Sequence, residues 1–165
     1  SHIFPDYWED FLKPIPEKER DDMVGAYYKR LDSDNELARM ATAKAWAKWE
    51  GRTSTLHPSK TVVDHFSQPH NALSLARIEC HYFSHDSFLE PNQILRDAER
   101  LANIPGIIVQ GRYDVVCPMQ SAWDLYHVWP GSVMQIIPDA GHSALETGII
   151  DALVRATDDF ALRLE

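Results

Sequence analysis

Two side chains of the catalytic type stand in matching positions near the C-terminal end of the chain. Asp114 follows an apolar run, residues 104–110, and His142 follows the next apolar run, residues 133–137. A histidine moves protons near neutral pH, and a carboxylate beside it fixes its tautomer and stabilises its charged form. The two residues therefore have the chemistry of the acid and base of a triad that activates a nucleophile.

The elements around this pair predict a parallel sheet. Residues 104–110 and 133–137 are short β-type runs, Pro118 can begin a helix between them, and a last amphipathic helix over residues 149–164 could cover the sheet. A strand, a helix and a second strand in this order make a parallel pair. Active sites in open parallel sheets lie at the carboxyl ends of the strands, where this pattern places both candidate residues.

The first hundred residues carry helical periodicity instead. A first helix is predicted within residues 3–16, where Pro14 and Pro16 stop it, and further helices over residues 17–31, 33–50, 71–83 and 91–101. For the third, Ser33 and Glu36 have the spacing of a capping box, and Gly51 is a usual C-terminal residue. We therefore expect an all-helical part before an α/β part, with the boundary near residue 103.

Two glutamates lie on apolar helix faces in this helical part. Glu50 is within about 60° of Ala43, Trp46 and Ala47 around its helix. Glu79 is surrounded in the same way by Ala72, Leu75, Ala76, Tyr82 and Phe83. Such a carboxylate must be neutral, paired, or directed at a cavity that receives a cation. A salt bridge to a neighbour such as Arg39 or Arg77 and a cation-binding site remain equal alternatives.

Composition excludes several functional classes. The net charge of −9 argues against a nucleic-acid or anionic-membrane partner, and 44% hydrophobic content is enough for a core. The two cysteines form no metal-ligand spacing or disulfide framework, so we expect no metal or other cofactor and a reducing, cytoplasmic setting. Neither a signal peptide nor an apolar run of roughly 18 residues is present.

A nucleophile is missing from the pattern. None of the seven glycines supplies a G-x-S-x-G elbow. Ser143 shares the loop of His142 and is a poor candidate, and Cys117 lies in V-V-C-P with no activating partner in sequence. The chain also begins abruptly with aromatic residues. We expect the back half of an enzyme, inactive by itself.

Several long stretches resemble one known family. They read FPDYWEDFLKPIP, AYYKRL, AKAWAKWEG, ARIECHYF, GRYDVVCPMQSAWDL and AGHSA. They resemble the C-terminal half of prolyl aminopeptidase (proline iminopeptidase), a serine peptidase family of the α/β-hydrolase fold with a helical cap. The resemblance implies a cap domain over residues 1–102 and the C-terminal portion of the hydrolase core over residues 103–165. By matching motif, Asp114 would be the triad acid and His142 the triad base.

The same resemblance implies roles for four further residues. Glu50 and Glu79 would hold the free α-amino group of a peptide that begins with proline, and Phe83 and Cys117 would belong to the apolar pocket for the proline ring. The family commonly has Asn where this chain has Cys80. The nucleophilic serine and most of the sheet would belong to a missing N-terminal half, and no metal would take part.

Two other functions remain open from the sequence. A different capped α/β-hydrolase, acting on esters or epoxides, would also need the Asp and His pair, although it would have no use for two cap carboxylates. A noncatalytic, cap-like binding module would explain the missing nucleophile.

Overall fold

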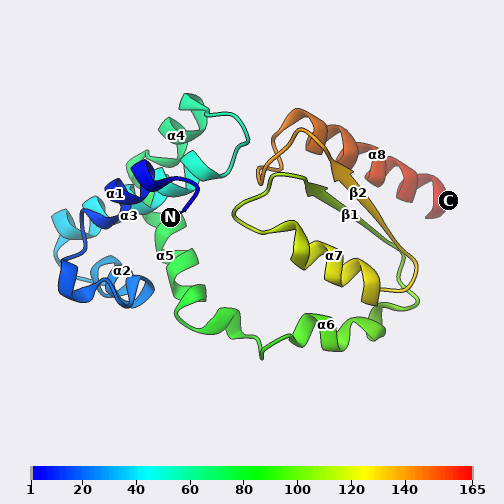
Figure 1. The fold of residues 1–165 in the computed structure, drawn as a ribbon, viewed down its shortest axis with the longest axis horizontal. Helices are drawn as coiled ribbons and strands as arrows, with labels where there is room; N and C mark the ends of the chain where they lie inside the picture. The colour runs from blue at the N-terminus through cyan, green and yellow to red at the C-terminus, as the bar shows by residue number, and fades with distance from the viewer. Residues whose placement is uncertain (1, 165) are drawn as a thin grey trace. The chain divides into compact units, whose positions relative to one another are not determined.

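The computed structural model describes residues 2–164 and divides them into two compact units. The first unit runs to Thr53 and resumes over Pro58–Glu90, and the second consists of Ser54–His57 and the chain from Pro91 onward. Figure 1 shows helices in the first unit and a parallel pair of strands with its own helices in the second. The short segment Ser54–His57 thus belongs to a different unit from the helices on either side of it in the sequence.

The first unit is built around one long helix. In order, its elements are α1 (Pro5–Leu12), η1 (Glu17–Glu19), α2 (Met23–Leu31), α3 (Glu36–Thr53), α4 (Lys60–Phe66), α5 (Pro69–Phe83) and η2 (Asp86–Phe88). Helix α3 contacts α1, α2, α4 and α5. The central position of α3 buries side chains along its second half, from Thr42 to Thr53.

Aromatic rings fill the centre of this unit. The ring of Tyr27 stacks on that of Phe11 with centroids 4.5 Å apart and meets the edge of Trp46 at 5.1 Å. The Tyr27 hydroxyl is buried with them and donates a 2.5 Å hydrogen bond to the carbonyl oxygen of Phe11. Burial raises the pKa of this hydroxyl, so it stays a donor. The core therefore joins α1, α2 and α3 through rings and one buried hydrogen bond.

Two predictions about the ends of α3 are wrong. The side chain of Asn35, not that of Ser33, caps the helix by accepting from the backbone N–H of Ala38 at 3.1 Å. Gly51 lies inside the helix, which continues to Thr53. A β-carbon at Gly51 would lie 3.0 Å from the Cα of Val63, so glycine is needed there for the close approach of α4.

Helix α4 itself was not expected, because residues 60–66 fall in a stretch that reads as a polar loop. Ser59 caps this helix by accepting from the N–H of Val62 at 3.4 Å. The packing of α4 against α3 and α5 supplies what its short sequence lacks.

The second unit contains the sheet. Its elements are α6 (Gln93–Asp97), η3 (Ala98–Leu101), β1 (Gly106–Gly111), α7 (Met119–Val128), β2 (Ser132–Ile137) and α8 (Thr147–Leu164). The strands pair in parallel, from Gly106 opposite Ser132 to Gly111 opposite Ile137, as the sequence predicts. Helices α7 and α8 both pack against the strands. Helix α6 packs against α7, and residues 91–102 belong to the same unit as the sheet.

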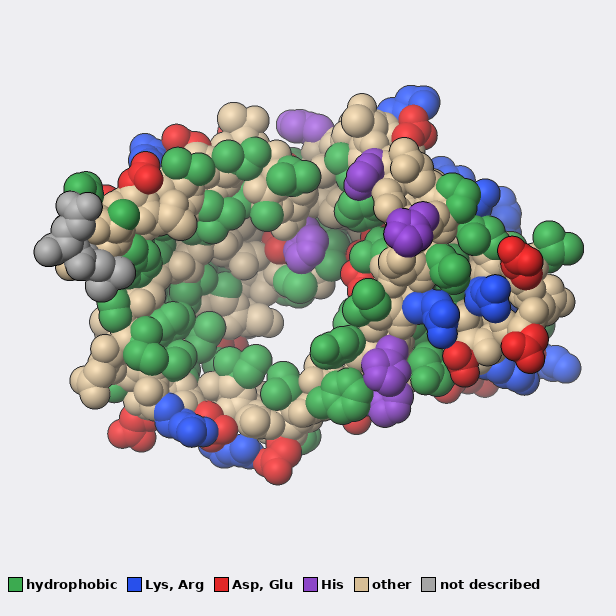
Figure 2. Space-filling model, turned by 180° about the vertical axis from the view of Figure 1, so that it is seen from behind, with side chains coloured by type: hydrophobic (Ala, Val, Ile, Leu, Met, Phe, Trp, Pro, Cys, Tyr) green, Lys and Arg blue, Asp and Glu red, His purple; other side chains and the backbone are tan. Residues whose placement is uncertain are grey.

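The sheet is only partly covered by the residues described. The four inner residues of β1 are half-buried, and Val133 of β2 is 51% exposed. Further exposed apolar side chains on α7 and α8 are Trp123, Val128, Ile150, Leu153 and Val154. Figure 2 shows apolar side chains gathered on a face of this unit. An apolar surface of this kind around a two-stranded sheet is typical of a face that other structure covers.

Across residues 2–164, none of the helices combines the length and the apolar character needed to cross a membrane.

Candidate active site

The loops that follow β1 and β2 are joined by backbone hydrogen bonds. The N–H of Arg112 donates to the carbonyl of Ile137 at 2.9 Å, and that of Tyr113 donates to Ala140 at 3.0 Å. A β-carbon at Gly111 would overlap the carbonyl oxygen of Gly141, so a glycine at the end of β1 allows the loops to come this close. The local backbone therefore brings the residues after each strand side by side.

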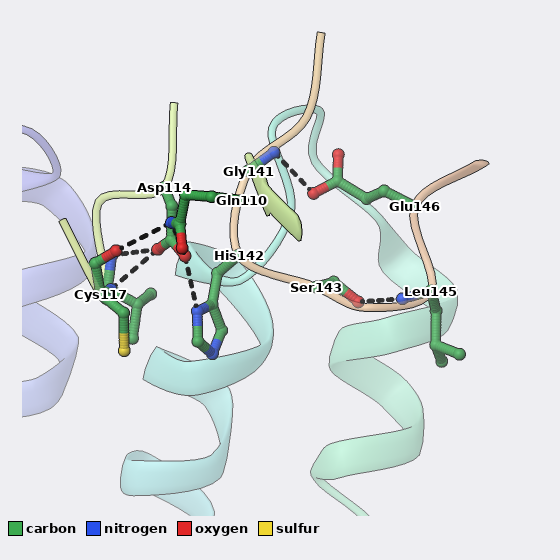
Figure 3. A network of polar contacts seen from close by, with 9 residues as sticks. Gln110, Asp114, Cys117, Gly141, His142, Ser143, Leu145 and Glu146 are labelled. Carbon is green, nitrogen blue, oxygen red and sulfur yellow. Dashed lines mark hydrogen bonds and ion pairs between the residues drawn. The ribbon is translucent and has the colours of Figure 1, made fainter. Parts of the chain in front are cut away.

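This arrangement places His142 against Asp114. The imidazole Nδ1 lies 3.0 Å from the Asp114 Oδ2, and Figure 3 shows the ring directed at the carboxylate. The Asp114 side chain is 6% exposed, whereas that of His142 is 37% exposed. With Nδ1 protonated and donating to Asp114, the Nε2 lone pair is left to accept a proton from a nucleophile. The two residues paired by the sequence pattern thus lie together in the structure.

The Asp114 carboxylate is held by three further donors. Its Oδ1 accepts from the backbone N–H groups of Val116 at 3.0 Å and Cys117 at 2.8 Å, and its Oδ2 also accepts from Gln110 Nε2 at 3.0 Å. Hydrogen bonds to a carboxylate are among the stronger ones in proteins, so this set fixes the orientation that His142 meets. Gln110 could have been noticed in the sequence, because it is a polar residue at the end of an otherwise apolar strand.

Cys117 and Ser143, the two residues considered as nucleophiles in the sequence, lie in the loops that carry this pair. Cys117 is exposed, and its carbonyl accepts from Gln110 Nε2 at 3.2 Å, so its backbone shares the network of Asp114. The Ser143 hydroxyl accepts from the N–H of Leu145 at 3.2 Å (Figure 3). That contact is a local turn of the loop, in which the hydroxyl oxygen accepts from the backbone.

The two glutamates predicted on apolar faces lie in the first unit, on α3 and α5. Both are half-buried. Glu79 Oε2 accepts a 2.7 Å hydrogen bond from the indole Nε1 of Trp46, which is 4% exposed. Burial, followed by the negative charge of Glu79, raises the pKa of Glu50 to about 7. The negative charge of Glu79 is therefore close enough to disfavour the charged form of Glu50.

The arginines considered as partners have contacts elsewhere. Arg77 lies 3.5 Å from the carboxylate of Asp32, and Arg39 donates to the carbonyl of Ser33 at 2.9 Å. A cation that reached Glu50 and Glu79 would lower the pKa of Glu50. The indole of Trp46 was noted in the sequence only as an apolar neighbour, and its role as a donor has no local signal.

Phe83 stands one turn after Glu79 on α5. Its ring centroid is 6.1 Å from that of Trp46, and the residue is 52% exposed. Such a ring has an open face that an apolar ligand could contact. Nowhere in residues 2–164 do three or more His, Cys, Asp or Glu side chains meet in a group that could hold a metal ion.

Comparison with known proteins gives matches over almost the whole chain. No protein-family model matches it. The proline iminopeptidase of Xanthomonas citri is 56% identical over 162 residues, and that of Xylella fastidiosa (strain 9a5c) is 54% identical over 161 residues. The predicted resemblance to proline iminopeptidases is confirmed. The proline iminopeptidase of Arabidopsis thaliana is also 46% identical over 158 residues.

The matches cover nearly all of this chain but only part of each relative. They include 98%, 97% and 94% of this chain for the Xanthomonas, Xylella and Arabidopsis proteins, but 52%, 51% and 42% of the proline iminopeptidases themselves. The chain thus spans about half the length of the curated relatives it matches.

Proposed function

We propose that this chain is the acid, base and amine-recognition part of a serine exopeptidase that releases N-terminal proline from peptides. It would act with a further segment that carries the nucleophilic serine. The observation that carries the proposal is the Asp114 and His142 pair, 3.0 Å apart, in a chain that is 56% identical over 98% of its length to a proline iminopeptidase. In this proposal residues 1–102 are the helical cap domain and residues 103–165 the C-terminal portion of an α/β-hydrolase core.

The chemistry assigned to the pair is acyl transfer. The serine hydroxyl attacks the carbonyl carbon of the N-terminal proline while His142 Nε2 takes its proton. The same proton passes to the leaving amine as the peptide bond breaks. A water then attacks the acyl group by the same route and frees proline and the serine. Asp114 holds the Nδ1 proton throughout and stabilises the imidazolium.

Glu50 and Glu79 are assigned to the α-amino group of the substrate. A protonated N-terminal proline has two N–H donors on a cationic nitrogen, so two carboxylates can each accept one charge-assisted hydrogen bond. Glu50, whose pKa is about 7, releases its proton more readily when the substrate cation is present. The fixed position of Glu79 on the Trp46 indole supports this assignment. Phe83 and Cys117 stay proposed contacts of the proline ring.

The partly covered sheet supports a segment beyond these residues. Inner residues of a parallel strand are normally buried on both faces, whereas those of β1 are half-buried. The remaining strands of a hydrolase core would pack here. A cytoplasmic setting belongs to the same proposal.

The proposal is tested in a chimera. This chain would replace the matching half of the Xanthomonas citri proline iminopeptidase, and hydrolysis of a proline arylamide would be measured. We expect turnover, and we expect Glu50→Gln and Glu79→Gln each to lower kcat/KM by roughly tenfold to a hundredfold, since each removes a hydrogen bond to a charged group. A folded chimera without activity would contradict the assignment.

The same chimera separates the two alternatives. If the protein is an ester or epoxide hydrolase, the glutamine variants should leave ester hydrolysis unchanged and proline arylamide should not be a substrate. If this chain is a noncatalytic module, it should neither restore activity nor react with a fluorophosphonate probe. The peptidase proposal also predicts that the probe does not react with this chain alone. It differs in predicting that the probe labels the chimera.

A further inference from the structure

A short segment far from His142 in sequence holds the backbone on which that residue stands. Residues 54–57, called the strap here, follow α3 directly and belong to the unit that contains the sheet. The carbonyl oxygen of Ser54 accepts from two consecutive N–H groups, those of His142 at 3.0 Å and Ser143 at 2.7 Å. The loop after β2 is therefore attached to the strap at the histidine itself.

Glu146 ties the strap to the same loop a second time. Its Oε1 accepts from the N–H of Gly141 at 2.8 Å, and its Oε2 accepts from the N–H of Leu56 at 3.3 Å. Figure 3 shows this carboxylate directed at Gly141, on the side of the loop away from Asp114. One side chain thus holds both the residue before His142 and the strap that receives the N–H of His142.

The fit at Gly141 is tight. A β-carbon there would lie 2.9 Å from the Leu56 nitrogen and 3.1 Å from Glu146 Oε1. The loop, the strap and the carboxylate are therefore in direct contact, with little room for the loop to shift without breaking a hydrogen bond.

The imidazole of His142 needs this support because packing does not fix it. With a side chain that is 37% exposed, its position depends on the Asp114 contact and on its own backbone. The Asp114 contact fixes how the ring turns, but it does not fix where the Cα lies. Small errors of position are costly for a catalytic base.

We propose that Glu146 is a positioning residue, which acts through the strap to hold His142 against Asp114. The effect of Glu146 on catalysis rests on the proposed function. Its effect on the position of His142 does not. The Glu146 carboxylate acts on the backbone N–H groups of Gly141 and Leu56, not on the side chain of Asp114 or His142.

The Ser54 side chain offers a matched control. Its hydroxyl is buried and has no hydrogen-bond partner among the described residues, while its carbonyl makes both contacts to the loop. Ser54→Ala removes the hydroxyl and keeps the carbonyl. A second control, Glu99→Ala, removes an exposed glutamate in the same unit.

Amide hydrogen exchange of the chain, followed by NMR, tests the positioning. In Glu146→Ala we expect the amides of Gly141 and Leu56 to exchange about tenfold faster or more, since each loses a hydrogen bond to a charged group. The decisive amides are those of His142 and Ser143, whose N–H groups donate to the Ser54 carbonyl and not to the Glu146 carboxylate. They should also exchange faster, and the ring nitrogen shifts of His142 should move toward those of a mixture of tautomers.

Glu146→Gln should give an intermediate result, because its amide can accept at one position but presents N–H to the other donor. Ser54→Ala and Glu99→Ala should match the parent chain. Unchanged exchange at β1 and β2 shows that a variant is folded. If only Gly141 and Leu56 exchange faster while His142 and Ser143 keep their rates and ring shifts, the proposal is overturned.

The chimera gives the catalytic readout. Glu146→Ala should lower kcat at least tenfold with little change in KM, with partial recovery in Glu146→Gln. An inactive parent chimera would count against the proposed function and leave the exchange result standing. An active chimera whose kcat is unaffected by Glu146→Ala would overturn the catalytic part of the inference.

Discussion

Replacing Glu50 by Gln should make the first unit more stable above neutral pH. The carboxylate is half-buried on α3 and close to the charge of Glu79, and these two effects raise its pKa from 4.5 to about 7. A glutamine has a similar shape but no charge to bury. The substitution therefore removes an unfavourable charge rather than a favourable contact.

The sign and size of this change in the unfolding free energy follow from proton linkage. A carboxyl group that holds its proton more tightly in the folded state stabilises that state fully below pH 4.5, and the contribution is lost as pH rises through about 7. The difference between these two pKa values corresponds to at most about 3 kcal/mol. The unfolding free energy of the first unit should fall by up to this amount between pH 4.5 and 8, and the Glu50→Gln variant should not show this part of the fall.

The buried thiol of Cys80 provides the assay. It is 0% exposed in the first unit, so a short alkylation pulse at fixed pH, after equilibration in urea, labels it only when this unit unfolds. Mass spectrometry separates its peptide from that of the exposed Cys117. Glu9→Gln, at an exposed position of α1, is the control and should leave the pH dependence as it is. Equal stability of Glu50→Gln and the parent chain at pH 8 would refute the reasoning.

Two further substitutions test the packing that places the site. Gly111→Ala should destabilise the second unit by about 1–3 kcal/mol or more, because the new methyl group meets the carbonyl oxygen of Gly141; faster amide exchange in β1 would show it, and parent-like exchange would contradict the close approach. Tyr27→Phe should lower the stability of the first unit by about 1–3 kcal/mol, because the buried carbonyl of Phe11 loses its donor. Cys80 labelling measures the second effect, and an unchanged urea midpoint would count against it.

The spacing of apolar residues predicted the helices and strands in which this spacing is regular. Helix α5 and the parallel pair β1 and β2 were expected within a few residues of their observed bounds. Local rules failed where distant residues decide the backbone. Gly51 reads as a helix end, but α3 continues through it to Thr53, and α4 approaches closely at this glycine. Helix α4 is short and packs against α3 and α5, contacts that a local pattern does not reveal.

The candidate site also has a part that the sequence predicted and a part that it did not. Asp114 and His142 could be predicted because each follows a strand, and strand order in a parallel pair places the loops together. The contacts between distant residues around the candidate side chains could not be predicted. Glu146 meets Leu56 across 90 residues of sequence, and Trp46 donates to Glu79 across 33 residues. Such contacts depend on tertiary packing and have no local pattern.

The most direct test of the acid and base assignment is the turnover of proline arylamide by the chimera with Asp114→Asn. The account predicts that kcat falls by ~10⁴-fold, because the imidazole loses the partner that fixes its tautomer. Asp158→Asn, at an exposed position of α8, should retain parent activity. A loss of less than about tenfold in folded Asp114→Asn chimera would contradict the assignment of this pair.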